Sequence, residues 1–533
     1  MNIPANAKTQ TISGEKYVFI DTPYWNAEKH RGEHKRRYIG KIVEGQFVPN
    51  GRYLLSLEKS GTIKPGPVPV TECKRQFYGA TYLLDQIGDK LGIVDDLKAS
   101  FPDKYKQLLS LAYFFVLEEG MSAYRLRKWA LTHNHPYGRD IPSQRISDLM
   151  GSIDEASKMN FFRRQAKRRA EKEYLAFDTT SISSYSELIK LAKYGKNKEG
   201  DHLPQVNLAL LYGEVSRLPV YFRKLTGNTA DVSLIRNLML DIDFLDMKKL
   251  SFVMGRGFYS EKNINDLMKR HHKFLIGIRC GLKIARKHLD EIRGEKMISW
   301  ENYHDDVGLY AMSFTDEWDY REEQPRTGKC ICDKRRVYVH IYFNDQRCTD
   351  ERLSFARYLT CLQDELKSGR KTDGHMKDYD KYFIVTETPK RGLHIVPKGD
   401  AIRERQRDFG YFVLLTNGIK NPVEAIKLYR VRDLIEKAFA NLKERLDMRR
   451  MSVSSSENFE GKLFVQFLAL IYLSYIKKQM DEKGLYKKYT MQTLLDDLDI
   501  IELYQQPGRA HHLSEITKKQ IALYDAMGVP FPK

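Results

Sequence analysis

The chain has 533 residues, of which 42% are hydrophobic, so it is long and apolar enough to fold roughly two to four domains. Lys and Arg total 89 against 70 Asp and Glu, and this formal net charge of +19 favours a polyanionic partner, with nucleic acid as the first expectation. Alternatively, the basic residues could serve solubility or binding to a membrane surface. The six cysteines include no CxxC pair, which argues against a zinc site.

No feature of the sequence predicts export or a membrane span. The first residues lack the apolar segment of a secretory signal. The longest apolar run, 463–475, is interrupted by Gln466 and is too short to cross a bilayer. We therefore expect a cytoplasmic protein with reduced thiols and no membrane partner.

The first part of the chain predicts two domains. Residues 1–65 alternate in the manner of short strands and indicate a small β-rich module. Residues 70–170 show helical periodicity and indicate a helical DNA-binding domain. Within it, the helix expected from about Ser143 resembles the second helix of a helix-turn-helix, or is an ordinary bundle helix.

A cationic stretch ends this helical region. Residues 161–174 carry Arg163, Arg164, Arg168 and Arg169 together with Lys167. On a helix these side chains form a broad positive face that suits DNA phosphates. A solvated linker helix is the other interpretation.

From residue 171 the pattern becomes α/β. We predict strands at 174–183, 203–214 and 218–227, a helix at 231–242, a strand at 250–254, a helix at 260–271 and a strand at 273–279. This order, β-β-β-α-β-α-β, is that of a ribonuclease-H-like domain. Residues 171–280 are therefore predicted to be the first part of such a core.

The rest of the chain completes a multidomain α/β protein. The irregular segment 281–405 predicts a β-rich insertion domain within the core. Residues 406–450 resume the core with a strand at 411–417 and one long helix, capped by Asn421. Residues 451–533 predict a helical C-terminal region.

Two of these elements carry candidate functional residues. Asp178 ends the apolar part of the first core strand, where a carboxylate is costly to bury unless it binds a cation or hydrogen-bond donors. On the long helix, Tyr429, Arg432, Glu436 and Lys443 fall within about 60° of one another at roughly 100° per residue. A turn-capping aspartate and an exposed face of ion pairs are the alternatives, but neither accounts for the alignment of the two elements.

The helix face carries a specific resemblance. Tyr429 to Lys443 matches the Tyr-(2)-Arg-(3)-Glu-(6)-Lys signature of bacterial insertion-sequence DDE transposases. YLAFDTTSIS resembles the first-aspartate strand of that group, LTGNTAD its Gly-Asn-x-x-Asp turn and GRGFYSEKNI its second-aspartate region. With four segments in the right order, the chain resembles this group along most of its length.

The resemblance implies a fold and a chemistry. The fold is a ribonuclease-H-like, retroviral-integrase-like core interrupted by an insertion. In the group, carboxylates hold two Mg²⁺ ions, for which Mn²⁺ can substitute, and this implies Asp178 and Glu436 as catalytic metal ligands. Arg432, Lys443 and Tyr429 would contact DNA.

The resemblance also implies partners. These are double-stranded DNA, as terminal inverted repeats and as target, and a second copy of the chain in a homodimer. The location would be the bacterial cytoplasm, at the nucleoid. Arg256 would contact DNA, and Trp300 or Trp318 in the insertion could stack on a flipped base, although a structural tryptophan is the more ordinary interpretation.

One position departs from the group. Its second catalytic Asp is replaced by Gly255, so one of three metal ligands is missing. Asp241, Asp243 and Asp246 precede the strand and would lie roughly 15 Å away. We expect a protein that binds transposon ends and cleaves them poorly, and we favour an engineered or recently inactivated form over a decayed copy or a site that works with two carboxylates.

Two other functions remain open from the sequence. A domesticated or regulatory DNA-binding protein without catalysis would use the same basic surface. A metal-dependent nuclease unrelated to transposition would need only Asp178 and Glu436. Neither requires the complete Tyr-Arg-Glu-Lys face, which favours a transposase that performs cut-and-paste cleavage and strand transfer.

Overall fold

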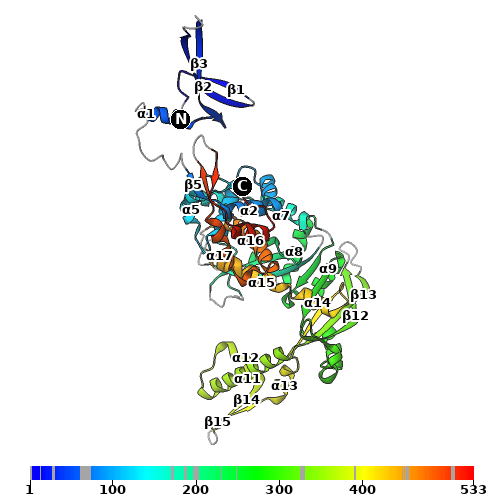
Figure 1. Cartoon of the computed structure of the whole chain (residues 1–533). Helices are drawn as coiled ribbons and strands as arrows, with labels where there is room; N and C mark the ends of the chain where they lie inside the picture. Colours follow the sequence, from blue (N-terminus) through cyan, green and yellow to red (C-terminus); the bar gives the residue numbers. More distant parts are fainter. Residues whose placement is uncertain are drawn as a thin grey trace. The chain divides into compact units, whose positions relative to one another are not determined.

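The computed structural model (Figure 1) describes residues 3–12, 14–26, 31–59, 74–169, 173–184, 189–195, 203–229, 231–247, 249–323, 330–388, 392–446, 448, 450–451, 455–505 and 510–533. The chain divides into two compact units. The first comprises Met1–Ile153, Arg445–Asp447 and Glu460–Lys533, and the second comprises Asp154–Glu444 and Met448–Phe459. Each unit therefore combines segments that are far apart in the sequence.

The first unit begins with a four-stranded antiparallel sheet, as the alternating pattern predicts. Its strands, in spatial order, are β1 (Ala7–Ile12), β2 (Glu15–Asn26), β3 (Arg31–Val43) and β4 (Gln46–Pro49). β3 turns into β4 through Glu44 and Gly45, whose φ angles of 51° and 80° suit a two-residue hairpin turn. Helix α1 (Gly51–Lys59) follows, and its Tyr53 shares a small core with Val18, Ile39 and Phe47.

The rest of the first unit is mainly helical. Its described helices are α2 (Gly79–Lys90), α3 (Ile93–Ser100), α4 (Tyr105–Leu117), α5 (Leu126–Thr132), α6 (Ser143–Gly151), most of α16 (Ser456–Glu482), α17 (Met491–Asp499) and α18 (Lys518–Ala526). A small sheet of β5 (Lys74–Phe77), β18 (Glu502–Gln505) and β19 (His512–Leu513) joins the N-terminal and C-terminal segments. The helical regions predicted separately at 70–170 and 451–533 thus fold largely together.

Helix α16 is long and apolar enough to cross a membrane by length and composition alone. However, 94% of its apolar window is buried inside the protein, as in a core helix. Tyr472 of α16 packs edge-on against Tyr113 of α4, with ring centroids 5.5 Å apart, and Phe464 packs against Phe101 at 5.3 Å. The apolar run at 463–475 is therefore the buried middle of a longer helix.

The second unit is organised around a large sheet in the order β11-β12-β13-β16-β10-β9-β6-β7-β8. The predicted core elements are present as β6 (Tyr174–Ser184), β7 (Gln205–Gly213), β8 (Pro219–Thr226), α8 (Asp231–Phe244), β9 (Ser251–Met254), α9 (Glu261–Lys269) and β10 (Lys273–Ile278). β6, β7 and β8 form an antiparallel meander, and the short β17 (Arg450–Met451) also pairs with β6. β9 runs parallel to both β6 and β10.

The register between β6 and β9 positions the candidate site. Phe177 pairs with Met254, the last residue of β9. Asp178 and Gly255 follow directly on these two neighbouring parallel strands, which lie about 4.8 Å apart in such sheets. Position 255 is therefore next to the aspartate.

The segment 281–405 differs from the predicted β-rich insertion in two respects. Its β11 (Tyr303–His304), β12 (Leu309–Glu323) and β13 (Cys330–Phe343) extend the central sheet beside β16 (Tyr411–Thr416). It also carries the 24-residue helix α11 (Asp345–Ser368), together with α10 (Lys283–Ile292), α12 (Met376–Tyr382), α13 (Gly399–Gln406) and the hairpin β14 (Phe383–Thr388) and β15 (Gly392–Pro397). Helix α11 was not predicted because it has few buried positions, so its charged sequence shows little hydrophobic periodicity.

The single long helix predicted at 421–446 is interrupted in the structure. It forms α14 (Pro422–Tyr429), α15 (Arg432–Ala440) and a π-helical turn, Asn441–Arg445. Asn421 caps α14, because its side chain accepts hydrogen bonds from the amides of Val423 and Glu424. Between α14 and α15, the amide of Asp433 donates to the carbonyl of Arg430, so the chain tightens to i→i−3 hydrogen bonds.

Candidate functional site

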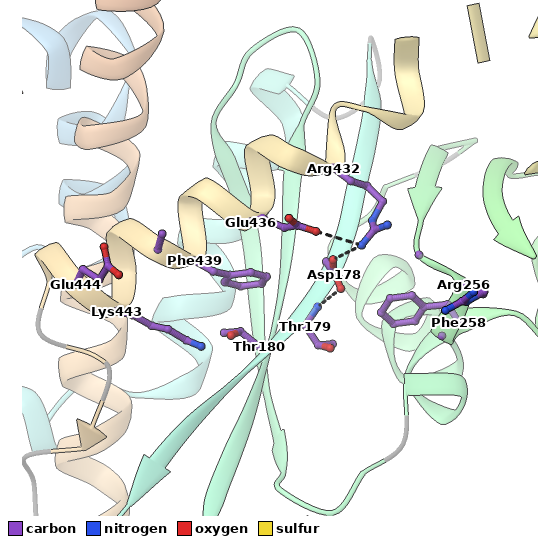
Figure 2. A pocket seen from close by; sticks show the side chains of 13 residues that line it. Asp178, Thr179, Thr180, Arg256, Phe258, Arg432, Glu436, Phe439, Lys443 and Glu444 are labelled. Atoms are coloured by element: carbon purple, nitrogen blue, oxygen red, sulfur yellow. Dashed lines mark hydrogen bonds and ion pairs between the residues drawn. The ribbon is translucent and has the colours of Figure 1, made fainter. Parts of the chain in front are cut away.

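A pocket of about 520 Å³ in the second unit collects most of the predicted site residues (Figure 2). Its lining residues come from β6, from the turn after β9 and from the α15 segment: Asp178, Thr179, Thr180, Gly255, Arg256, Gly257, Phe258, Arg432, Glu436, Phe439, Ala440, Lys443 and Glu444. Segments separated by more than 250 residues thus meet at one edge of the sheet. Tyr429 is not among the lining residues, but it contacts one of them.

Asp178 is held by hydrogen bonds on both carboxylate oxygens. Its side chain is only 13% exposed. Oδ2 accepts a hydrogen bond from Nη2 of Arg432 at 2.8 Å, and Oδ1 accepts one from the amide of Thr179 at 2.8 Å. The burial of this carboxylate is therefore offset by an ion pair and a backbone donor.

Arg432 links both carboxylates of the pocket. Its Nη2 lies 3.6 Å from Oε1 of Glu436 as well as 2.8 Å from Asp178. Its Nη1 donates a hydrogen bond to the hydroxyl of Tyr429 at 3.0 Å. Figure 2 shows the guanidinium reaching from α15 towards Asp178, with Glu436 beside it. Tyr429 therefore positions Arg432 rather than lining the pocket.

The guanidinium of Arg432 is largely buried, with a side-chain exposure of 20%. Burial acts to lower the pKa of Arg432, but Tyr429 and Asp178 outweigh it and raise that pKa above its ordinary value. The Nε of Arg432 is buried without a hydrogen-bond partner among the described residues. The Arg432 side chain is thus a fixed cation, and its Nε–H group lacks a hydrogen-bond acceptor among the described residues.

Gly255 leaves room for this guanidinium. A Cβ built at position 255 would lie 3.2 Å from both Cζ and Nη2 of Arg432. The backbone there, with φ −72° and ψ 167°, is extended and accessible to any residue. Glycine is therefore not required by the backbone, and a side chain at this position would point at the guanidinium and have to displace its flexible end.

The other predicted pocket residues are more accessible. Glu436 is 63% exposed, and Arg256 is exposed in the 3-10 turn that follows β9. Lys443 lies in the π-helical turn that follows α15. Together with Glu444 of the same turn, it lines the pocket. Phe439 of α15 was not among the predicted site residues but also lines the pocket. Only its spacing relative to Glu436 and Lys443 could have indicated this.

The donor set fits a pair of metal ions poorly in this arrangement. Asp178 and Glu436 provide the oxygen ligands that divalent cations prefer, but both are turned towards the same guanidinium. Within the described part of the chain, no group of three or more His, Cys, Asp or Glu side chains is placed to hold an ion. The site is organised around Arg432, and no reaction step through a metal follows from it.

The cationic stretch lies on α7 (Glu155–Arg169), apart from the pocket lining. Arg163 is half-buried, donates to the carbonyl of Phe244 at 3.1 Å and stacks over its ring at 5.2 Å. Arg164 and Arg168 are exposed, whereas the side chain of Arg169 lies outside the described residues. Among the described side chains of this stretch, Arg163, Arg164 and Arg168 do not line the pocket of Asp178.

Two of the three aspartates that precede β9 form ion pairs with other residues. Asp241 forms an ion pair with Arg223 and lines a different pocket, of about 420 Å³. Asp243 forms an ion pair with Arg270. Neither lines the pocket of Asp178. The sequence missed the cations of the second pocket, where burial and the neighbouring Lys158 lower the pKa of Lys224 to about 8.

The two tryptophans of the 281–405 segment differ. Trp318 of β12 is 7% exposed and donates through Nε1 to Oδ1 of Asn265 at 2.8 Å, which is a structural role. Trp300 is 82% exposed. Of the two, only Trp300 is available to a ligand.

Comparison with known proteins places the chain in a family. The profile described as "Transposase DDE domain" matches residues 169–472, more than half of the chain. No curated protein sequence matches. A cryo-EM structure of a piggyBac transposase synaptic complex with hairpin DNA is similar at 9% identity and a TM-score of 0.36, covering 79% of this chain and 77% of that one. The chain belongs to the transposase DDE domain family.

Proposed function

We propose that the protein is an insertion-sequence DNA transposase of the Tyr-Arg-Glu-Lys group, and that this copy binds transposon ends but cleaves them poorly. The observation that carries the proposal is the pocket. Asp178, Arg432, Glu436 and Lys443 line one cavity, although Asp178 and Arg432 are 254 residues apart. A chance match to the signature would not bring these side chains to one site.

The sheet supports a ribonuclease-H-like core. An antiparallel meander, β6 to β8, is followed by β9 and β10, which run parallel to β6. Asp178 and position 255 stand side by side on β6 and after β9. In a DDE site these would be the first and second acidic residues, so the register supports the assignment of Gly255 to the position of a missing ligand.

Divalent metal ions are the usual cofactors of DDE transposases. We propose Mg²⁺, with Mn²⁺ as a substitute, and Asp178 and Glu436 as the ligands that this chain would supply. Both carboxylates are paired with Arg432, so an ion has to compete with a guanidinium. Because Gly255 supplies no ligand, the metal ion is bound by fewer carboxylates and competes less well with Arg432. We therefore propose that cleavage is impaired.

DNA is the proposed partner, with terminal inverted repeats and target DNA bound by a homodimer. The pocket wall carries the cations Arg256 and Lys443 beside Arg432, and the chain as a whole has a net charge of +19. We propose the helical region 70–170 as the part that reads bases and the exposed arginines of α7 as phosphate contacts.

A DNA-binding regulator without catalysis is the second candidate. The observation that favours it is the pairing of Arg432 with both carboxylates beside Gly255. Such a pocket can hold a phosphate through Lys443 and Arg256 without cleaving it. Transposase and regulator differ in the DNA sequence that they protect.

Footprinting on the DNA that flanks the coding region separates the two. We expect protection of terminal inverted repeats on both sides, and weaker protection by Lys443→Ala. The matched control is Lys437→Ala, an exposed lysine of α15 that does not line the pocket. Protection confined to promoter sequence would contradict the transposase proposal and support the regulator.

A further inference from the structure

The hairpin of β2 and β3 extends beyond the N-terminal sheet. The two strands pair from Lys16 with Ile42 to Asn26 with Arg31. β1 pairs only with residues 15–20 of β2, and β4 pairs only with residues 40–43 of β3. Residues 21–26 and 31–37 therefore form a two-stranded ribbon that has no other strand beside it in the described chain (Figure 1). This segment is called the ribbon below.

The ribbon is rich in cations. Its second strand carries Arg31, Lys35, Arg36 and Arg37, all exposed. The carboxylates of the described ribbon are Asp21 and Glu33, both only partly exposed. The positive groups therefore outnumber the negative ones and lie further towards solvent.

The contacts of these cations are of a kind that DNA can replace. Arg31 pairs with Glu33 at 2.9 Å, and its side chain is 65% exposed. Arg36 donates to Oε1 of Gln10 at 3.2 Å and lies over the ring of Phe19 at 5.1 Å. These contacts are exposed to water, where ion pairs contribute little to stability, so exchanging them for phosphate contacts costs little.

Two aromatic side chains stand near the end of the ribbon. Trp25 is 66% exposed and Tyr24 is 45% exposed. The hydroxyl of Tyr24 donates to Glu33 at 2.9 Å, which fixes its ring against the other strand. Exposed aromatic rings beside arginines are typical of surfaces that contact sugars and bases.

The shape and charge of the ribbon fit duplex DNA. About six residue pairs at ~3.3 Å each give an arm roughly 20 Å long, the length of about six base pairs. The major groove, about 12 Å wide, admits a two-stranded β-ribbon. A protein partner fits less well, because the centres of protein interfaces are depleted in charge, whereas this surface carries four cations in one short strand.

We propose that the ribbon is a DNA-binding arm that enters a groove of duplex DNA, separate from the pocket of Asp178. The inference rests on the proposed function in that DNA is the partner. It assigns to the N-terminal module a contribution to affinity and none to cleavage. The phosphates bind the arginines and lysine, and Trp25 contacts the groove.

The test uses the full chain and a labelled duplex that contains the flanking inverted repeat. Arg31→Gln combined with Lys35→Gln removes two ribbon charges while leaving the contacts of Arg36 and Arg37 in place. The control, Lys487→Gln with Lys488→Gln, removes two exposed charges near the C-terminus. Binding is measured by fluorescence anisotropy between about 50 and 200 mM salt.

We expect the ribbon variant to bind about tenfold more weakly than the control at the higher salt, with a salt slope less steep by about 2. A second variant, Trp25→Ser, should weaken binding without changing the salt slope. Affinity and slope equal to those of the control would overturn the inference. If the unaltered chain fails to bind any duplex, the proposed function itself fails.

Discussion

At the residue scale, the pocket is defined by the pair of Arg432 and Gly255. The guanidinium lies within ion-pairing distance of both Asp178 and Glu436, and the space above Gly255 accommodates it. The two carboxylates of this pocket are thus paired with an internal cation. Six of the predicted residues line the pocket: Asp178, Gly255, Arg256, Arg432, Glu436 and Lys443. The sequence did not predict the pairing with Arg432, because this pairing depends on the register of β6 with β9 and on the start of α15.

Arg432→Gln should open the pocket to divalent cations. Removing one partner of a largely buried ion pair leaves Asp178 uncompensated, and we expect a loss of about 1–3 kcal/mol in the free energy of unfolding. Mn²⁺ should then bind between Asp178 and Glu436 and restore part of this stability. Mn²⁺ binding is measured by electron paramagnetic resonance, and stability by denaturant unfolding.

The control for this prediction is Arg432→Gln combined with Asp178→Asn. It lacks the guanidinium and also the main oxygen ligand, so it should bind no more Mn²⁺ than the unaltered chain. If the unaltered chain already binds Mn²⁺ as tightly as Arg432→Gln, the guanidinium does not compete for the site.

At the element scale, hydrophobic periodicity predicted the core strands and helices from β6 to β10 well, because their apolar runs are buried on the sheet. It failed for the helix at 421–446, where a tightened turn and a π-turn interrupt a continuous apolar pattern. Periodicity reports which face is buried and not the local hydrogen-bond spacing. It also missed that Arg163 is held by Phe244, a contact between distant elements.

The packing of α2 on α4 gives a prediction about pH. The hydroxyl of Tyr113 donates to Asp85 at 2.7 Å, and burial raises the pKa of Asp85 from 3.8 to about 6. A raised pKa means that the folded state prefers the protonated carboxyl, so this stability is complete below about pH 4 and is lost as the pH rises through about 6. Asp85→Asn should therefore be more stable than the unaltered chain at pH 8, by about 1–2 kcal/mol.

The pH prediction is checked by thermal unfolding of both proteins at several pH values. The advantage of Asp85→Asn should shrink as the pH falls and disappear near pH 4. Asp103→Asn, an exposed position in the same region, should follow the curve of the unaltered chain. An advantage for Asp85→Asn that does not vary with pH would show that the carboxyl is not the cause.

At the scale of the whole molecule, both units are assembled from distant parts of the sequence. The helical N-terminal and C-terminal regions share one core: Tyr82 packs against Tyr524 at 5.9 Å, and the hydroxyl of Tyr524 donates to the carbonyl of Gly79 at 2.8 Å. Sequence periodicity could find these helices but not their association, because each amphipathic face is compatible with many partners. The same limit applies to β12 and β13, which extend the central sheet.

A chain that ends at residue 459 should lose the fold of residues 74–153. Most of α16, together with α17 and α18, would be absent, which exposes the apolar faces of α2 and α4 to water. Limited proteolysis followed by mass spectrometry should show rapid cleavage within 74–153. Adding residues 460–533 as a separate chain should restore protection, and a truncated chain that resists cleavage on its own would contradict the shared core.

Strand cleavage of an inverted-repeat duplex in Mg²⁺ or Mn²⁺ tests whether Gly255 is the reason for impaired cleavage. We predict that the chain with Gly255 binds the duplex and leaves it almost uncut, whereas Gly255→Asp cleaves it at the transposon end, because a third carboxylate beside Asp178 and Glu436 lets a metal ion compete with Arg432 for these ligands. The backbone at position 255 accepts this residue without strain. Efficient cleavage by the chain with Gly255 would contradict the proposal that the missing carboxylate impairs cleavage.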